Sequence, residues 1–198
     1  MIRLAIIDSG GANIASLRYA IERLGIDSQV TTDPATLRSA THVILPGVGA
    51  AADCMERLRS ANLIEAIRGL RQPLLGVCVG MQLLFESSEE GGVTCLGLLP
   101  GRVHRFADRD GLPVPHMGWN QLEFAGPSPL LDDVASGDHV YFVHSYCAPV
   151  NENTVATTTY GERFAAIVRR DNVFGAQFHP ERSAQAGALV LRNFLLVS

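Results

Sequence analysis

The sequence predicts an α/β fold of three layers, with a mostly parallel central sheet, helices on both of its faces and an antiparallel extension. In the first half of the 198 residues, short apolar runs alternate with helical patterns. Such alternation is typical of parallel strands joined by right-handed crossovers. In the second half, strand candidates follow one another closely with Pro and Gly between them, as in antiparallel meanders. No repeat or linker divides the chain, so we expect one domain over residues 1–198.

The elements of the first half follow in order. Ile2–Ile7 is a continuous apolar run closed by Gly10-Gly11, which predicts a strand buried on both faces. A helix ended by Gly25 comes next, because four apolar residues recur at helical spacing: Ile14, Leu17, Ile21 and Leu24. Three further strands are expected: Ser28–Thr32, His42–Leu45 and Pro73–Val77. Helical stretches are expected between the last two of these strands, up to about Leu70.

The second half contains six strand candidates and a final helix. The candidates are short, apolar or β-branched and bounded by turn residues: Gly101–Phe106, Asn120–Phe124, His139–His144, Thr154–Thr159, Phe164–Val168 and Val173–Phe178. The last helix is expected over Ala184–Leu196.

Composition excludes several classes of protein. The formal charge is −4 and all sixteen basic residues are arginines without a basic stripe, so we expect no nucleic-acid partner. Without lysine, a Walker-type phosphate loop and Schiff-base chemistry are excluded. No apolar run is long enough to span a membrane, and the first residues do not resemble a signal peptide. Four cysteines without a C-x-x-C pair indicate neither a disulfide framework nor a metal site. We therefore expect a cytoplasmic protein.

The candidate nucleophile is Cys78, in the string Gly76-Val77-Cys78-Val79-Gly80. Glycines two positions before and after a nucleophile are typical of an elbow, a tight strand-to-helix turn where larger side chains would collide with neighbouring backbone. Cys78 would then lie at the carboxyl edge of the sheet and at the amino end of a helix over Val79–Glu86, whose dipole favours a thiolate. The N–H of Val79 would face a tetrahedral oxyanion. Taken alone, the pattern equally fits a small buried cysteine.

The candidate base is His179, in the string His179-Pro180-Glu181 after the predicted strand Val173–Phe178. Proline keeps the preceding residue extended, and residues two apart in an extended segment point to the same side. Glu181 can therefore fix the tautomer of His179 and leave the other ring nitrogen for Cys78, as in a catalytic triad. A surface His–Glu pair is the alternative, and the elbow cysteine favours the triad.

Pro46-Gly47-Val48-Gly49 ends another buried strand at the same sheet edge. Its glycines leave the backbone free to rotate, so an amide of Val48 or Gly49 can act as a second oxyanion donor. A plain turn is the alternative. Three cysteines lack an elbow and are interpreted as buried apolar residues: Cys54, Cys95 and Cys147.

These segments together resemble the class I glutamine amidotransferases over essentially the whole chain, which implies a flavodoxin-like fold. Three further strings resemble the glutaminase subunits of imidazole glycerol phosphate synthases in histidine biosynthesis: Met81-Gln82-Leu83-Leu84-Phe85, Pro115-His116-Met117-Gly118-Trp119-Asn120 and Tyr141-Phe142-Val143-His144-Ser145-Tyr146. Glutaminases of anthranilate synthase and GMP synthetase usually have His or Gln where Met81 stands.

The resemblance implies that the triad hydrolyses glutamine to glutamate and ammonia, without a metal or other cofactor. Gln82 and the backbone of Ser145-Tyr146 would hold the α-amino and α-carboxylate groups of the substrate. The implied partner is a (β/α)8-barrel cyclase in a heterodimer, which uses the ammonia to make imidazole glycerol phosphate and AICAR. Four residues are expected at that interface: Asn13, Trp119, Tyr141 and Arg182.

The chain departs from the family pattern near this interface. Arg182 replaces a frequent Lys, Ala12 stands where Gly is common, and Ala50-Ala51 replace a common aromatic residue. Other readings remain open. The chain could serve a different synthase, such as an anthranilate-type enzyme, or be a DJ-1-like or peptidase-like cysteine hydrolase. The latter would require neither the H-P-E string nor the P-G-V-G string.

Overall fold

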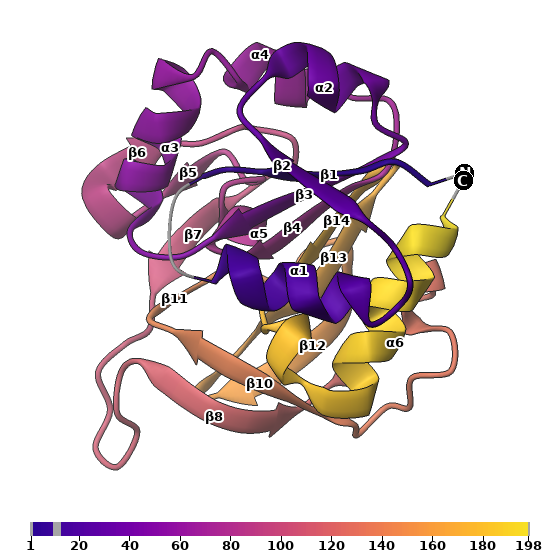
Figure 1. Cartoon of the computed structure of the whole chain (residues 1–198). Helices are drawn as coiled ribbons and strands as arrows, with labels where there is room; N and C mark the ends of the chain where they lie inside the picture. Colours follow the sequence, from indigo (N-terminus) through magenta and orange to yellow (C-terminus); the bar gives the residue numbers. More distant parts are fainter. Residues whose placement is uncertain (1, 10–12, 198) are drawn as a thin grey trace.

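The computed structural model describes residues 2–9 and 13–197, and an eight-stranded sheet forms its centre (Figure 1). Five strands are parallel: β1 (Leu4–Ile7), β2 (Ser28–Thr31), β3 (His42–Gly47), β4 (Leu74–Cys78) and β14 (Val173–Ala176). Three antiparallel strands extend this sheet: β13 (Glu162–Arg170), β12 (Thr154–Tyr160) and β9 (Glu123–Phe124). The order β2-β1-β3-β4-β14-β13-β12-β9 confirms the predicted fold class.

The parallel strands are buried as their apolar runs predict. Every residue of β1, β3, β4 and β14 is buried, whereas the edge strand β2 has only its last residue buried. A strand without alternation of apolar and polar residues needs cover on both faces. The carboxyl ends of β3 and β4 therefore emerge side by side from a rigid core.

Helices supply that cover on both faces. Figure 1 shows α1 (Ile14–Glu22) and α6 (Ala184–Leu196) on one side of the sheet. On the other side lie α2 (Pro34–Ser39), α3 (Ala51–Ser60) and α4 (Ile64–Arg68). The predicted limits of α6 are confirmed, and Gly25, with φ of +79°, follows α1 as expected. Among the described residues, no helix has the length and apolar character needed to cross a bilayer.

Two smaller sheets complete the fold. One is the antiparallel pair of β8 (His116–Gln121) and β10 (His139–His144). The other has the order β11-β7-β5-β6 and contains β5 (Ser87–Ser88), β6 (Val93–Thr94), β7 (Arg102–Arg105) and β11 (Tyr146–Cys147). Three single turns of 3-10 helix lie at Glu90–Gly92, Pro129–Leu131 and Pro180–Arg182.

Two predicted elements were wrong in extent. The expected strand Asn120–Phe124 is broken at Leu122, because β8 pairs with β10 while β9 pairs with β12 in the central sheet. The amide and carbonyl of Leu122 bond instead to Asp138 and Gly137, and its side chain is fully buried where the chain changes sheets.

The helix expected over Val79–Glu86 is only the short α5 (Val79–Gln82). The carbonyls of the next three residues accept hydrogen bonds from the 96–99 segment, which replaces the next helical turn: Leu83, Leu84 and Phe85. Gly10-Gly11, for which the sequence predicts a turn, and Ala12, which departs from the family pattern, lie outside the described residues.

Candidate active site

The turn at Cys78 has the geometry of an elbow. Cys78 ends β4 with φ of +54° and ψ of −113°, and α5 begins at the next residue. A side chain at Gly76 would place its Cβ 2.6 Å from the carbonyl oxygen of Gly80. A Cβ at Gly80 would overlap the carbonyl of Leu45 on β3. The two flanking glycines are therefore required by the close approach of backbone, as the sequence pattern predicts.

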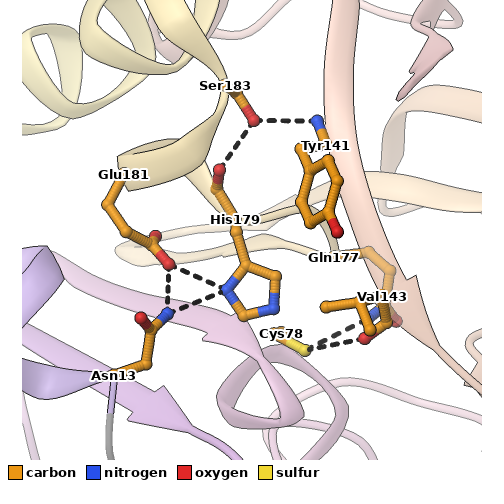
Figure 2. A network of polar contacts seen from close by, with 8 residues as sticks. All are labelled: Asn13, Cys78, Tyr141, Val143, Gln177, His179, Glu181 and Ser183. Carbon is orange, nitrogen blue, oxygen red and sulfur yellow. Dashed lines mark hydrogen bonds and ion pairs between the residues drawn. The ribbon is translucent and has the colours of Figure 1, made fainter. Parts of the chain in front are cut away.

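His179 and Glu181 form a buried pair beside this elbow. His179 is extended, with φ of −95° and ψ of +98°, and Pro180 starts a turn of 3-10 helix. Nδ1 of His179 lies 2.8 Å from Oε1 of Glu181, and the two side chains are 6% and 1% exposed. Figure 2 shows the other ring nitrogen of His179 on the side of Cys78. This orientation is the one that a triad requires.

The surroundings of His179 stabilise its protonated form. Burial by itself lowers the pKa of the imidazole, but hydrogen bonds with Cys78 and Glu181 outweigh burial and raise this pKa to about 10. At neutral pH the resting ring is therefore an imidazolium that can donate a proton. The largest raising contribution comes from Cys78, so the basicity of His179 depends on the state of that sulfur.

Asn13, predicted at a partner interface, lies in the described structure next to the His–Glu pair. Its side-chain amide donates a hydrogen bond to Oε1 of Glu181, and its Nδ2 lies 3.2 Å from Nδ1 of His179 (Figure 2). Because Nδ1 of the imidazolium is itself a donor, the carboxylate is the group that Asn13 holds. The first loop of the chain thereby fixes the orienting residue of the pair.

The backbone of His179 is anchored to β10. The amide of His179 donates to the carbonyl of Tyr141 over 2.9 Å. Ser183 Oγ donates to the carbonyl of His179 over 2.6 Å and accepts from the amide of Tyr141 over 2.9 Å. The side chain of Tyr141, expected at the partner interface, is half-buried, whereas its cross-strand neighbour Trp119 is 52% exposed. Their rings meet edge to face, with centroids 6.0 Å apart.

A cleft of about 520 Å³ opens in front of Cys78 and His179. Register explains how the P-G-V-G loop reaches it: Gly47 pairs with Cys78, so Val48 and Gly49 emerge beside the elbow. Most of the predicted site residues line this cleft: Asn13, Val48, Gly49, Cys78, Val79, Gln82, Ser145, Tyr146, His179 and Arg182. Gly49 has φ of +90°, a conformation that favours glycine.

Gln82 forms the floor of this site together with Gln177, a residue that our sequence analysis did not identify. Nε2 of Gln82 donates to the carbonyl of Tyr146 over 2.8 Å and to Oε1 of Gln177 over 3.1 Å. Oε1 of Gln82 is buried and has no hydrogen-bond partner among the described residues. Nε2 of Gln177 in turn lies 4.0 Å from Sγ of Cys78. Gln177 directly follows β14, and Glu181 lies in the 3-10 turn that starts at Pro180, so this turn, and not the strand alternation expected from sequence, brings Glu181 to His179.

A chain of hydrogen bonds extends from the cleft into the β8–β10 sheet. Nδ1 of His144 lies 2.8 Å from the carbonyl of Tyr146, so this nitrogen bears the hydrogen. Nε2 of His144 then accepts from Nδ1 of His116 over 3.2 Å, and Nε2 of His116 accepts from Asn120 over 3.4 Å. Every donor in this relay points toward Tyr146.

Both histidines of the relay are held neutral. Burial lowers the pKa of His116 to about 4 and that of His144 to about 3. His116 also stacks between Phe142 and Tyr160, with ring centroids 4.9 and 4.1 Å away. This packing holds the ring in place, and the relay in turn fixes the backbone at the floor of the cleft.

The site contains a strained cysteine on an elbow, with a buried imidazole and a carboxylate beside it. This arrangement is typical of enzymes that use a cysteine nucleophile for acyl transfer. Sequence comparison identifies the family. The chain belongs to the glutamine amidotransferase class-I family, which matches residues 5–197.

Two relatives from different organisms carry the same name. The imidazole glycerol phosphate synthase subunit HisH of Xanthomonas euvesicatoria pv. vesicatoria (strain 85-10) is 55% identical over 198 residues, covering 100% of this chain and 99% of the relative. The same subunit of Xylella fastidiosa (strain Temecula1 / ATCC 700964) is 53% identical over 195 residues, covering 98% of each chain. These relatives confirm the resemblance that the motifs predict.

Solved structures show the same fold at greater distance. PurLQS from Thermotoga maritima superimposes with a TM-score of 0.71 at 22% identity, over 98% of each chain. A second solved structure, described as a glutamine amidotransferase, gives a TM-score of 0.75 at 20% identity, over 97% of this chain and 96% of that chain.

Proposed function

We propose that this chain is the glutaminase subunit of imidazole glycerol phosphate synthase, acting in the cytoplasm as one domain over residues 1–198. It would hydrolyse glutamine through Cys78, His179 and Glu181 and pass the ammonia to a (β/α)8-barrel cyclase. That cyclase would release imidazole glycerol phosphate and AICAR. The observation that supports this best is the 2.8 Å contact between His179 and Glu181 beside the strained elbow, in a chain 55% identical to a HisH subunit.

In the acylation step, the Cys78 sulfur attacks the side-chain amide carbon of glutamine. The resulting oxyanion would be held by the N–H of Val79 and by an N–H of Val48 or Gly49, since these residues border the same cleft. As the carbon–nitrogen bond breaks, the His179 imidazolium gives its proton to the departing ammonia. A glutamyl thioester on Cys78 remains.

In the deacylation step, His179 changes from acid to base. Acylation removes the contribution of Cys78 that raises the pKa of His179, so the ring becomes a neutral base as the thioester forms. The ring then takes a proton from water as the water oxygen attacks the thioester carbon, and glutamate leaves as the Cys78 sulfur is released. Glu181 holds Nδ1 throughout both steps.

Gln82 and the Ser145-Tyr146 backbone suit the binding of the substrate's amino-acid end. Gln82 borders the cleft, and its buried Oε1, which has no hydrogen-bond partner among the described residues, would accept from an α-ammonium group that binds there. A buried acceptor without a partner has a free-energy cost of about 1–3 kcal/mol, which such a ligand would relieve. We assign the α-carboxylate to the backbone at Ser145-Tyr146.

The cyclase would dock near the cleft mouth. On β8, the outward-facing Met117 and Trp119 are 64% and 52% exposed, and aromatic residues and methionine are enriched in interfaces. Arg182 is exposed at the cleft wall, where its planar guanidinium can pair with a carboxylate of the partner. Asn13 would contribute from the same side.

The test compares two nitrogen sources for synthesis by the complex with the cyclase. Cys78→Ala should abolish glutamine-dependent formation of imidazole glycerol phosphate and leave synthesis from ammonium salts intact. Cys95→Ala, a change at a buried cysteine outside the cleft, should leave both intact. Retained glutamine-dependent synthesis in Cys78→Ala would refute the nucleophile, and failure of the chain to bind or serve the cyclase would refute the assignment to this synthase.

A further inference from the structure

A second group of potential ligand atoms lies outside the cleft. His104 on β7, Cys147 on β11 and Glu162 at the start of β13 place one ligand atom each within 4.8 Å of the other two. His104 and Cys147 are cross-strand partners in the β11–β7 pair, and Glu162 reaches them from the central sheet. Their distance along the sequence hides this cluster from any motif.

The spacing of these atoms fits a tetrahedral metal ion. Nε2 of His104 lies 3.5 Å from Sγ of Cys147 and 2.9 Å from Oε2 of Glu162. With metal–sulfur and metal–nitrogen bonds of about 2.3 and 2.0–2.1 Å, two ligands of a tetrahedral Zn²⁺ lie about 3.3–3.6 Å apart. The sulfur–nitrogen distance already has this value, and the carboxylate needs to move by about half an ångström from the ring.

One nitrogen, Nε2 of His104, faces both the sulfur and the carboxylate. A catalytic triad needs its nucleophile and its carboxylate on different ring nitrogens, so this group is not a second triad. Convergence of three donors on one point is instead what a metal ion requires.

The charges around the cluster favour a dication. Glu162 brings one formal negative charge to the cluster, and Cys147 would bring a second once it loses its proton, so a dication would balance the charge of its ligands. As the metal–sulfur bond forms, the thiol proton leaves to solvent.

We infer that His104, Cys147 and Glu162 form a binding site for a borderline-soft divalent cation of the Zn²⁺ type. Thiolate, imidazole and carboxylate donors together select such ions over Mg²⁺ or Ca²⁺. The side chains of His104 and Glu162 are 33% and 31% exposed, so ions can enter and water can occupy the fourth position. Cys147 directly follows Tyr146, so a metal here clamps the small sheet to the central sheet next to the cleft floor.

The test uses cobalt(II) titration of the full chain carrying Cys78→Ser, because Cys78 and His179 are a second thiol–imidazole pair that could bind metal. Thiolate-bound cobalt gives a charge-transfer band in the near ultraviolet. We expect one cobalt per chain with this band, displacement of the cobalt by Zn²⁺, and a rise of Tm on addition of Zn²⁺.

Further substitutions in the same background locate the site. Cys147→Ser should abolish the band, and His104→Gln or Glu162→Gln should weaken binding at least tenfold. Cys95→Ser, at another buried cysteine, should change nothing. Since His104 and Glu162 are partly exposed, their variants test the proposal even if Cys147→Ser does not fold. Absence of the band in the parent protein, or its persistence after Cys147→Ser or His104→Gln, overturns the inference.

Discussion

Nδ1 of His179 and Oε1 of Glu181 meet at 2.8 Å across a single proline, and only 1% of the glutamate side chain reaches solvent. The two residues are only two positions apart, and both side chains are buried. The proposed mechanism gives them different roles, proton transfer for His179 and orientation of the ring for Glu181, and substitutions can distinguish these roles.

His179→Ala should lower glutamine turnover by several orders of magnitude, because the proposed mechanism has His179 transfer the proton in both steps. The loss of glutamine turnover in Glu181→Ala should be smaller by roughly 50- to 100-fold, since the proposed role of Glu181 is only to orient the ring. The measurement is kcat/KM for glutamine in the complex with the cyclase, with a far-UV circular dichroism spectrum of each variant and its co-purification with the cyclase as the controls for folding. Equal losses in the two variants would show that Glu181 does more than orient.

The raised pKa of His179 predicts how stability depends on pH. The folded protein retains this proton up to pH of about 10, whereas the unfolded chain loses it near 6.5. The stabilisation is therefore complete below about pH 6.5 and is lost as pH rises toward 10. Urea unfolding between pH 6.5 and 9.5 should show a steeper decline for the wild-type protein than for His179→Gln. Parallel curves would contradict the assigned pKa.

Gly49→Ala tests the proposed oxyanion role of the loop without introducing a steric clash. A Cβ at Gly49 would meet no atom within 4 Å, so Gly49→Ala acts only through the φ of +90°. Loss of one oxyanion donor costs about 2.7–4 kcal/mol, or roughly a hundred- to a thousand-fold in rate. Gly137, with φ of +99° and equal space, provides the matched control. The idea fails if Gly49→Ala and Gly137→Ala turn over glutamine at the same rate.

The same loop predicts control by the partner. Glutamine turnover should be low for the chain alone, higher with the cyclase, and highest when the cyclase also holds its nucleotide. A ligand of the cyclase can have this effect only by binding more tightly when the loop amide faces the cleft. Gly49→Ala should abolish the stimulation. Equal rates in the three conditions would reject such gating.

The buried histidine relay predicts sensitivity to acid. The pKa values of about 4 and 3 for His116 and His144 lie below 6.5, so the unfolded chain binds more protons as pH falls. Stability should therefore decrease from pH 6.5 toward 4. His116→Phe keeps the aromatic packing but cannot be protonated, so its stability curve should be flatter over this range. His139→Gln, at an exposed position on β10, should retain the wild-type slope.

The parts of the site that could be predicted from sequence are those in which steric demands act locally. Gly76 and Gly80 flank Cys78 because other backbone atoms approach them closely. Pro180 keeps His179 extended through its own ring, whatever the exact end of the preceding strand. Both patterns are visible within a few residues. The buried strands were predictable for the same reason, since continuous apolar runs need cover on both faces.

The remaining parts depend on how distant strands align. His116 meets His144 because β8 and β10 pair in one particular register, and His104 meets Cys147 through the pairing of β7 with β11. No local pattern encodes these registers. The short length of α5 has a similar origin, because the 96–99 segment takes the carbonyls that would otherwise continue the helix.

The backbone conformation of Cys78, the proposed nucleophile, lowers the stability of the fold. A non-glycine residue at φ of +54° has a conformational cost of about 1–3 kcal/mol, which glycine at the same position would largely avoid. Selection for thermal stability alone would therefore favour Cys78→Gly, which should give a more stable protein without glutaminase activity. Attempts to engineer a thermostable form should leave this turn untouched and seek their gains in loops far from the cleft.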